Sequence, residues 1–327
     1  MSTSYIYSVS RVNTLSQELL TTTDIERLLV AAPGERLASA LKETYLAPYV
    51  LQVDDERVAD AIELTLIEAK NLISLITPNS SQFTVLWVQY DIHNLRVLAK
   101  ATKAGHAVGA LQGYFSNRGS YDPALLAQYA EQGTLSNLQP RFQEVYDQAV
   151  GLVQEGSIDE VDALFDALVL QSIKDIAAAA KDPFINSYVA AVIDVHNCKS
   201  HLRSLRLGDK IVDPVFVSGG KLGQSSLGDV DSIVAALESL AVGHFTDAAN
   251  AYVLDGHTTA LDARFDEYLV KLAYNASIDM FSSASIVLYY LRVRQAATNI
   301  RTITVGLESG QSADVIRPNI RFSHVSN

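Results

Sequence analysis

The side chains best suited to metal chemistry in this chain are three of its histidines. His93 and His196 occupy equivalent places in two similar segments, so we expect them in different parts of the fold. His196 and His201 are five residues apart, whereas two imidazoles on one helix face need a spacing of four. These spacings predict no metal site.

A glycine-rich loop at residues 218–226 (SGGKLGQSS) has the glycines and lysine of a phosphate-binding loop. Leu222, however, follows Lys221 where a nucleotide-binding loop needs Ser or Thr. No GxSxG, HExxH, EF-hand or GxGxxG sequence occurs. Acidic runs at residues 54–56 and 159–160 stand where helices are expected to begin, and the helix dipole explains them. We therefore predict no catalytic residue, no cofactor and no direct nucleotide binding.

The single cysteine, Cys198, falls on the apolar face of a predicted helix, so we interpret it as a core residue and not a reactive thiol. One cysteine allows no intrachain disulfide, which fits a reducing, cytoplasmic location. The N-terminal residues lack a basic segment followed by an apolar run, and no stretch approaches the roughly 20 apolar residues that cross a bilayer. We expect a soluble protein.

The composition limits the fold class and the kinds of partner. The chain has 327 residues, of which 48% are hydrophobic, so it can bury a large core. With 25 Lys and Arg against 37 Asp and Glu, the net charge of −12 disfavours nucleic acid as a partner. Only 8 Pro and 17 Gly occur, so long helices are expected and tight turns are few. The composition predicts an all-α protein.

One segment recurs three times at a spacing of about a hundred residues. YDIHNLRVLAKATKAG, ending at residue 105, aligns with IDVHNCKSHLRSLRLG, ending at residue 208, and then with QAATNIRTITVGLESG, ending at residue 310. The first alignment pairs Asp91 with Asp194 as well as the histidines. This period exceeds that of common solenoid repeats, so each unit should be a multi-helix lobe. We predict three pseudo-symmetric units at 1–106, 107–209 and 210–312, with a tail at 313–327.

Each core segment follows a second helix-forming segment that begins with acidic residues. These segments are residues 55–76, 160–181 and 260–276. Each unit should therefore contain two consecutive long helices. Nearer the N-terminus, Thr23 and Glu26 stand three residues apart before two leucines, which predicts a capping box at the start of another helix.

Apolar residues on the core helices define a face that should be buried. In the first unit these residues are Val88, Ile92, Leu95, Ala99 and Thr102, and in the second they are Ala191, Val195, Cys198, Leu202 and Leu205. The equivalent spacing predicts that both helices pack in the same way.

A row of basic residues lies beside this face on each of the first two core helices. The rows are Arg96, Lys100 and Lys103, and Lys199, Arg203 and Arg206. In the third unit Arg301 is kept, while Val305 and Glu308 take the later places. Two interpretations stay open. The rows are either solvated helix faces whose stems cover apolar neighbours, or surfaces that meet an acidic partner.

Asn94, Asn197 and Asn299 recur on the flank opposite the basic rows. A buried amide must be hydrogen-bonded. We therefore predict a structural role, in which each amide joins its helix to a preceding loop or to the partner helix of the unit.

The chain as a whole resembles the C subunit of archaeal and bacterial V-type (A-type) ATP synthases, which is similar to the d subunit of eukaryotic vacuolar ATPases. The residues that carry the resemblance are YSVSRV at 7–12, the first two core segments, FVSGGKL at 216–222 and YYLRVRQAATNIRTITVGLESG at 289–310. The match covers essentially the full chain. It departs from the family in the third core, where QAAT replaces residues that are often charged.

The resemblance implies a funnel-shaped, all-helical subunit of three similar lobes, between the central shaft of a rotary ATPase and its membrane ring. One end would receive the shaft subunits D and F, and the other would rest on the ring of proteolipid subunits. Torque would pass through the subunit without nucleotide binding. The basic rows would then face the shaft or the ring. The alternatives are a general helical scaffold for an unrelated protein, and an enzyme with an unrecognised pocket of polar groups with perturbed pKa values.

Overall fold

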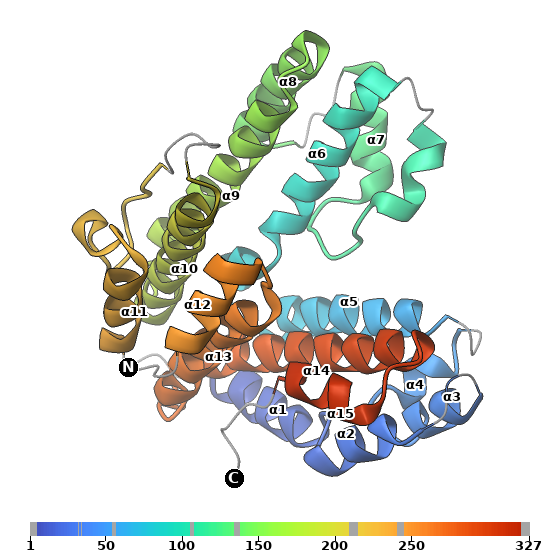
Figure 1. Cartoon of the computed structure of the whole chain (residues 1–327). Coiled ribbons are helices and arrows are strands. Elements are labelled where there is room, and N and C mark those ends of the chain that lie inside the picture. Colours follow the sequence, from blue (N-terminus) through green and yellow to red (C-terminus); the bar gives the residue numbers. More distant parts are fainter. Residues whose placement is uncertain are drawn as a thin grey trace. The chain divides into compact units, whose positions relative to one another are not determined.

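The computed structural model describes residues 5–31, 33, 35–53, 57–104, 108–133, 138–208, 215–240 and 245–321. Over these residues the chain is helical and contains no strand, which confirms the all-α prediction (Figure 1). None of the described helices is long and apolar enough to span a bilayer. The chain forms two compact units, Met1–Pro78 with Asp182–Asn327, and Asn79–Lys181. The three sequence units at 1–106, 107–209 and 210–312 stay a prediction.

The first compact unit contains eleven of the described α-helices. They are α1 (Ile6–Gln17), α2 (Thr22–Leu29), α3 (Glu35–Leu41), α4 (Ala47–Val50), α5 (Val58–Ile76), α10 (Pro183–Leu207), α11 (Val230–Ser239), α12 (Thr246–Asp255), α13 (Thr259–Ala276), α14 (Ala284–Glu308) and α15 (Ala313–Ile316). Short 3₁₀ helices lie at Gln224–Ser226 and Arg317–Asn319.

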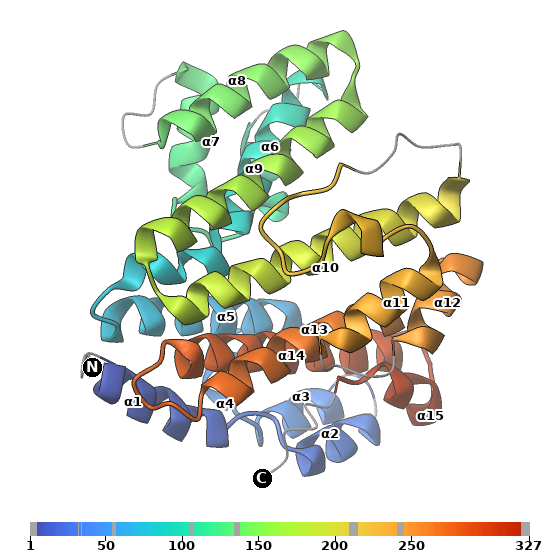
Figure 2. The ribbon, with the colours of Figure 1, turned by 90° about the vertical axis from the view of Figure 1, so that its left-hand side faces the viewer.

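The core of this unit is built around α14. This helix packs against α1, α5 and α13 (Figures 1 and 2). Ile286, Val287, Tyr290 and Ile300 are fully or almost fully buried although they point in different directions around the helix. A helix that is apolar on most sides must be enclosed by other elements, which is the position that α14 occupies.

The second unit consists of α6 (Val88–Ala104), α7 (Pro123–Gln132), α8 (Pro140–Glu155) and α9 (Ile158–Ala180), with 3₁₀ helices at Ser80–Leu86 and Val108–Tyr114. The core helix α6 packs against α7, α8 and α9. Ile92 and Leu95 of α6, Phe142 of α8 and Phe165 of α9 are all buried. The long helices predicted before each core segment correspond to α5, α9 and α13.

The predicted buried face of the core helices is correct except at its C-terminal end. Val88, Ile92, Leu95 and Ala99 are buried in α6, and Ala191, Cys198 and Leu202 are buried in α10, where Val195 is half-buried. Thr102 and Leu205, the last residues of the two series, are exposed. Both lie in the final turn of a helix, beyond its last buried residue in the series.

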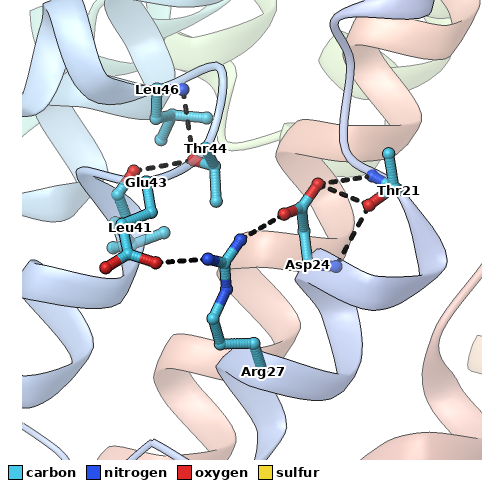
Figure 3. Close-up of polar contacts among 7 residues, drawn as sticks. All are labelled: Thr21, Asp24, Arg27, Leu41, Glu43, Thr44 and Leu46. Carbon is cyan, nitrogen blue, oxygen red and sulfur yellow. Dashed lines mark hydrogen bonds and ion pairs between the residues drawn. The ribbon is translucent and has the colours of Figure 1, made fainter.

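The capping box lies two residues earlier than predicted (Figure 3). Thr21 Oγ1 accepts a hydrogen bond from Asp24 N (3.1 Å), and Asp24 Oδ2 accepts one from Thr21 N (2.9 Å). The prediction of a box at Thr23 and Glu26 is therefore wrong. Because the cap is Thr21, α2 begins at residue 22, two residues earlier than predicted. Asp24 also pairs with Arg27, and Arg27 pairs in turn with Glu43, just after α3.

Candidate functional site

The repeated asparagines fasten loops to the core helices. Asn94 Nδ2 donates to Ser116 O (2.8 Å), and Asn94 Oδ1 accepts from Ser116 N (2.8 Å). Asn197 makes the same pair of bonds to Val217 O and N, both at 2.9 Å. Both amides are completely buried. The asparagine side chain thus provides hydrogen-bond partners for both the N–H and the C=O of one loop residue, which would otherwise have no backbone partner.

The third repeat keeps this arrangement. Asn299 Nδ2 donates to Arg321 O (2.9 Å), and Asn299 Oδ1 accepts from Arg321 N (2.9 Å). In all three repeats the bonded residue lies 20 to 22 positions after the asparagine. Each amide therefore holds a segment that follows its core helix, so the prediction of a preceding loop or a partner helix is wrong.

A carboxylate one turn before the asparagine adds a second attachment in the first repeat. Asp91 Oδ2 accepts from Ser120 N (3.0 Å), and Asp91 Oδ1 accepts from Tyr121 N (2.9 Å). Gly119 lies so close that a Cβ atom added there would be 2.1 Å from Asp91 Oδ1. Only glycine permits this approach.

The second repeat has the same carboxylate attachment. Asp194 accepts from the backbone N of Lys221 and of Leu222, both at 2.9 Å, and a Cβ atom on Gly220 would be 2.0 Å from Asp194 Oδ1. The glycine-rich loop therefore gives two of its N–H groups to Asp194, and this contact explains the glycine at position 220. In the third repeat Ala296 takes the aspartate's place, and the segment held by Asn299 is also attached to α13, through an ion pair between Arg321 and Asp266.

The first basic row contacts acidic residues of α9. Lys100 Nζ lies 2.7 Å from Asp162 Oδ1, and Arg96 Nη1 lies 3.7 Å from the same atom. Arg96 also pairs with Asp166, and its guanidinium carbon is 5.7 Å from the centre of the Phe165 ring. The side chain of Lys103 lies outside the described residues. The described part of this row therefore joins α6 to α9.

The second row begins in the same way. Lys199 Nζ lies 2.5 Å from Asp262 Oδ1 and 5.3 Å from the centre of the Phe265 ring, both on α13. At the end of α10 the Arg206 guanidinium lies 5.9 Å from the centre of the Tyr252 ring. Arg203 is exposed and has no ion pair among the described residues.

The members of the two basic rows differ in whether they have a carboxylate partner within the chain. Arg96, Lys100 and Lys199 have carboxylate partners within their own compact units, although each side chain stays partly exposed. Arg203 and Arg206 are exposed. A partner-facing role for the rows stays a prediction, and the end of α10 is the part best placed to carry it.

Cys198 is a core residue. Its side chain is completely buried, and burial, followed by the nearby charge of Asp194, raises the pKa of its thiol to about 12. The sulfur therefore stays protonated near neutral pH, and a protonated thiol is a poor nucleophile. This agrees with its interpretation from the sequence.

A cavity of about 470 Å³ lies in the second unit, against α6, α8 and α9. Asp91, Arg141 and Asp175 line it. Asp91 holds the loop N–H groups described above, and Arg141 Nη1 lies 2.6 Å from Asp175 Oδ2. Burial is the main cause that raises the pKa of Tyr121 at its edge. Within the described ranges no three His, Cys, Asp or Glu side chains are grouped as metal ligands would be. The charged groups around the cavity are thus engaged in structural contacts.

Comparison with known proteins gives one consistent family. The family model of the ATP synthase (C/AC39) subunit matches residues 8–319. The chain is 21% identical over 292 positions to the A-type ATP synthase C subunit of Methanocaldococcus jannaschii, covering 82% of this chain and 73% of that protein. It is 22% identical over 347 aligned positions to the A-type ATP synthase C subunit of Halobacterium salinarum, covering 97% of each chain.

Proposed function

The chain belongs to the ATP synthase (C/AC39) subunit family, and we propose that it is a non-catalytic central-stalk subunit of a rotary V/A-type ATPase. It acts as a socket between the shaft subunits D and F and the membrane ring of proteolipid subunits. Torque then passes between ATP turnover and ion translocation without nucleotide binding by this chain. The observation that carries the proposal is a family match that extends over nearly the whole chain.

The internal contacts of the fold support a mechanical role. A part that transmits torque must keep its loops attached to its helices under load. Here each of the three core helices holds a following segment through a buried asparagine, and two of them add a buried aspartate. Buried, fully paired polar groups resist displacement because an unpaired group costs about 1–3 kcal/mol.

We also propose that the three repeats form the three lobes of a funnel. Each lobe would be built around the core helix of one repeat and need not have the boundaries of that repeat. Support comes from three helix pairs within the compact units, in which α6 packs on α9, α10 on α13 and α14 on α5. Each pair joins the core helix of one repeat to the long helix that precedes the core of another. The subunit would lie at the cytoplasmic face of the membrane, held there by the rest of the complex.

The basic rows supply a candidate contact surface for an acidic partner. We propose that Arg203 and Arg206, at the exposed end of α10, orient the shaft or ring against this chain. Replacing both by Glu should weaken assembly with D, F and the ring, while Lys271→Glu, which reverses an exposed lysine on α13 that has no ion pair among the described residues, serves as a control. Unchanged assembly of the double variant would remove the end of α10 from the contact surface.

Co-purification tests the proposed function. The tagged chain is recovered from detergent-solubilised membranes of its host, and the proteins that come with it are identified. A rotary ATPase with its shaft and ring is the expected result. Recovery with an unrelated protein alone would favour a general helical scaffold and contradict the proposal.

A further inference from the structure

The basic residue two positions after each repeated asparagine has a different environment in the third repeat. In the first two repeats this residue is Arg96 or Lys199, and each has a carboxylate partner on another helix. In the third repeat it is Arg301, which is exposed. Arg301 has no ion pair or hydrogen bond among the described residues, whereas Arg294, about two turns earlier on α14, pairs with Asp266 of α13 at 3.1 Å.

The partners used in the first two repeats share one sequence pattern. They lie in VDALFD at residues 161–166 and LDARFD at residues 261–266. In each case the basic residue pairs with the first aspartate and lies over the phenylalanine ring three positions later, at 5.7 Å for Arg96 and 5.3 Å for Lys199. The chain thus recognises an acidic residue and an aromatic residue on one face of a helix, twice and with similar geometry.

The corresponding helix for α14 is α5, which lacks the first aspartate and the phenylalanine of this pattern and has Glu63 at the place of the second aspartate. Aligning the buried residue Val58 with Val161 places VADAIE, at residues 58–63, against VDALFD. Ala59 then stands at the place of the first aspartate, and Ile62 at that of the phenylalanine. The nearby Asp60 pairs instead with Arg57, at the start of its own helix. Apolar packing joins α14 to α5, and Arg301 receives no charge partner from it.

Arg301 belongs to an exposed face of α14. Val305, one turn later, has 55% of its surface exposed, and Glu308 ends the same row on the surface. The next position on the helix, Gly306, is covered instead, because a Cβ atom there would be 2.7 Å from Ile316 of α15. We define the docking face as Arg301 and Val305.

We propose that the docking face binds a helix of another protein that carries an acidic residue followed, three positions later, by an aromatic residue. Such a helix would supply to Arg301 the same two groups that the chain itself supplies to Arg96 and Lys199. Val305 would pack against the aromatic ring. The docking face goes beyond the proposed rotary role and does not depend on it.

Other occupants fit the docking face less well. Among the described helices of a second copy of this chain, the pattern occurs in α9 and α13, where both carboxylates and rings are already engaged. An anionic membrane surface attracts clusters of about four to eight basic residues, whereas this row has one cation and ends in Glu308. A partner helix with one matched charge and one ring is the remaining occupant that these side chains recognise.

Photo-crosslinking from position 305 tests this proposal. Benzoylphenylalanine is placed there in the full-length chain, which is expressed in its host and irradiated, and the crosslinked peptides are sequenced by mass spectrometry. The expected product joins position 305 to another protein, within a segment that has Asp or Glu three positions before Phe, Tyr or Trp. Crosslinks confined to the chain itself, or to segments without this pattern, would overturn it.

Charge reversal provides the matched control. Arg301→Glu in the same labelled chain should lower the crosslink yield at least about tenfold, because it places like charges together in the contact. Lys271→Glu, which reverses an exposed lysine on α13, should leave the yield unchanged. Both replacements are at exposed positions, so we expect them to leave the melting temperature of the chain unchanged. Equal melting temperatures of the two variants would show that both are folded. A yield that Arg301→Glu leaves intact would contradict the proposal.

The outcome also separates the docking face from the rotary role. If the crosslinked partner has the acidic and aromatic pattern but is no subunit of a rotary ATPase, the docking face stands and the proposed function fails. If the chain co-purifies with a rotary ATPase while position 305 crosslinks to nothing outside the chain, the proposed function stands and the docking face fails.

Discussion

At the scale of single residues, the asparagine of each core helix has the most consistent role in the molecule. Asn94, Asn197 and Asn299 each exchange two hydrogen bonds with the backbone of one later residue. The side chain therefore determines where the chain returns to the helix. Its recurrence indicates that the three repeats share a local structure as well as a sequence.

Replacing one of these amides should destabilise the fold. Asn197→Ala leaves the N–H and C=O of Val217 without partners, so we expect the free energy of unfolding to fall by about 1–3 kcal/mol. Asn275→Ala, at an exposed position of α13, should change it by less than about 0.5 kcal/mol. Denaturant titration of both variants measures the difference, and equal effects would contradict the structural role of the amide.

The glycines opposite the aspartates should resist any side chain. Gly220→Ala brings a Cβ atom against Asp194 Oδ1, and we expect a loss of about 1–3 kcal/mol. Gly151→Ala, inside α8 with open space around it, should instead stabilise the chain by up to about 1 kcal/mol. Thermal unfolding of the two variants checks these opposite signs. A neutral Gly220→Ala would show that the loop can move away from Asp194.

The sequence revealed these residues only in part. The repeat identified the asparagines and aligned Asp91 with Asp194, because side chains leave a signature in the sequence. Their partners are backbone groups of Ser116, Val217 and Arg321, and any residue type supplies those. Only the two glycines could have indicated where these loops meet the core helices, since Gly119 and Gly220 lie at similar distances after Asp91 and Asp194.

At the scale of helices, charged and aromatic contacts join the core helix of one repeat to the long helix of another. Arg96 on α6 and Lys199 on α10 lie over Phe165 and Phe265 and pair with aspartates one turn away. The hydrophobic pattern predicted that these helices exist. It did not predict which helices pair, because that depends on contacts between residues 63 to 70 positions apart.

The pair between α10 and α13 should contribute a modest amount of stability. Lys199→Ala removes a partly exposed ion pair and the contact with the Phe265 ring, so we expect a loss of about 1 kcal/mol. Lys271→Ala, on an exposed face of α13, should have no measurable effect. Denaturation midpoints at low and high salt provide the test. A Lys199→Ala loss that is unchanged by salt would show that stem packing, and not charge, joins the helices.

The start of α2 should make stability depend on pH. Burial alone would raise the pKa of Asp24, but hydrogen bonds from Thr21 and Arg27 outweigh it and hold this pKa below its ordinary value. A carboxyl with a lowered folded pKa stabilises the fold above its unfolded pKa of about 4, and this stabilisation is lost as the pH falls through the folded value.

A variant isolates this contribution. Asp24→Asn should be less stable than the parent near neutral pH, and the gap should close as the pH falls below about 4. Melting temperatures measured across this range give the comparison. A gap that is independent of pH would show that the charge of Asp24 has no role. The sequence predicted a cap in this region but misplaced it, because three consecutive threonines offer alternative starts and both Asp24 and Glu26 stand three positions after one of them.

At the scale of the whole molecule, composition and the repeat predicted an all-helical chain, and the structure confirms it over the residues it describes. The family followed from motif order and spacing, and the match over residues 8–319 confirms that resemblance. The compact units follow a different division, because helices of different sequence repeats pack together. A sequence repeat states which segments are alike, whereas a compact unit depends on which segments touch.

Coupling between ATP hydrolysis and ion pumping tests the central proposal most directly. Membrane vesicles from host cells that lack this chain are compared with the same vesicles after the purified chain is added back, measuring both ATP hydrolysis and ATP-driven ion uptake. We predict that hydrolysis persists without the chain while ion uptake is lost, and that adding the chain restores uptake. Ion uptake that remains coupled to hydrolysis in its absence would contradict the proposed role.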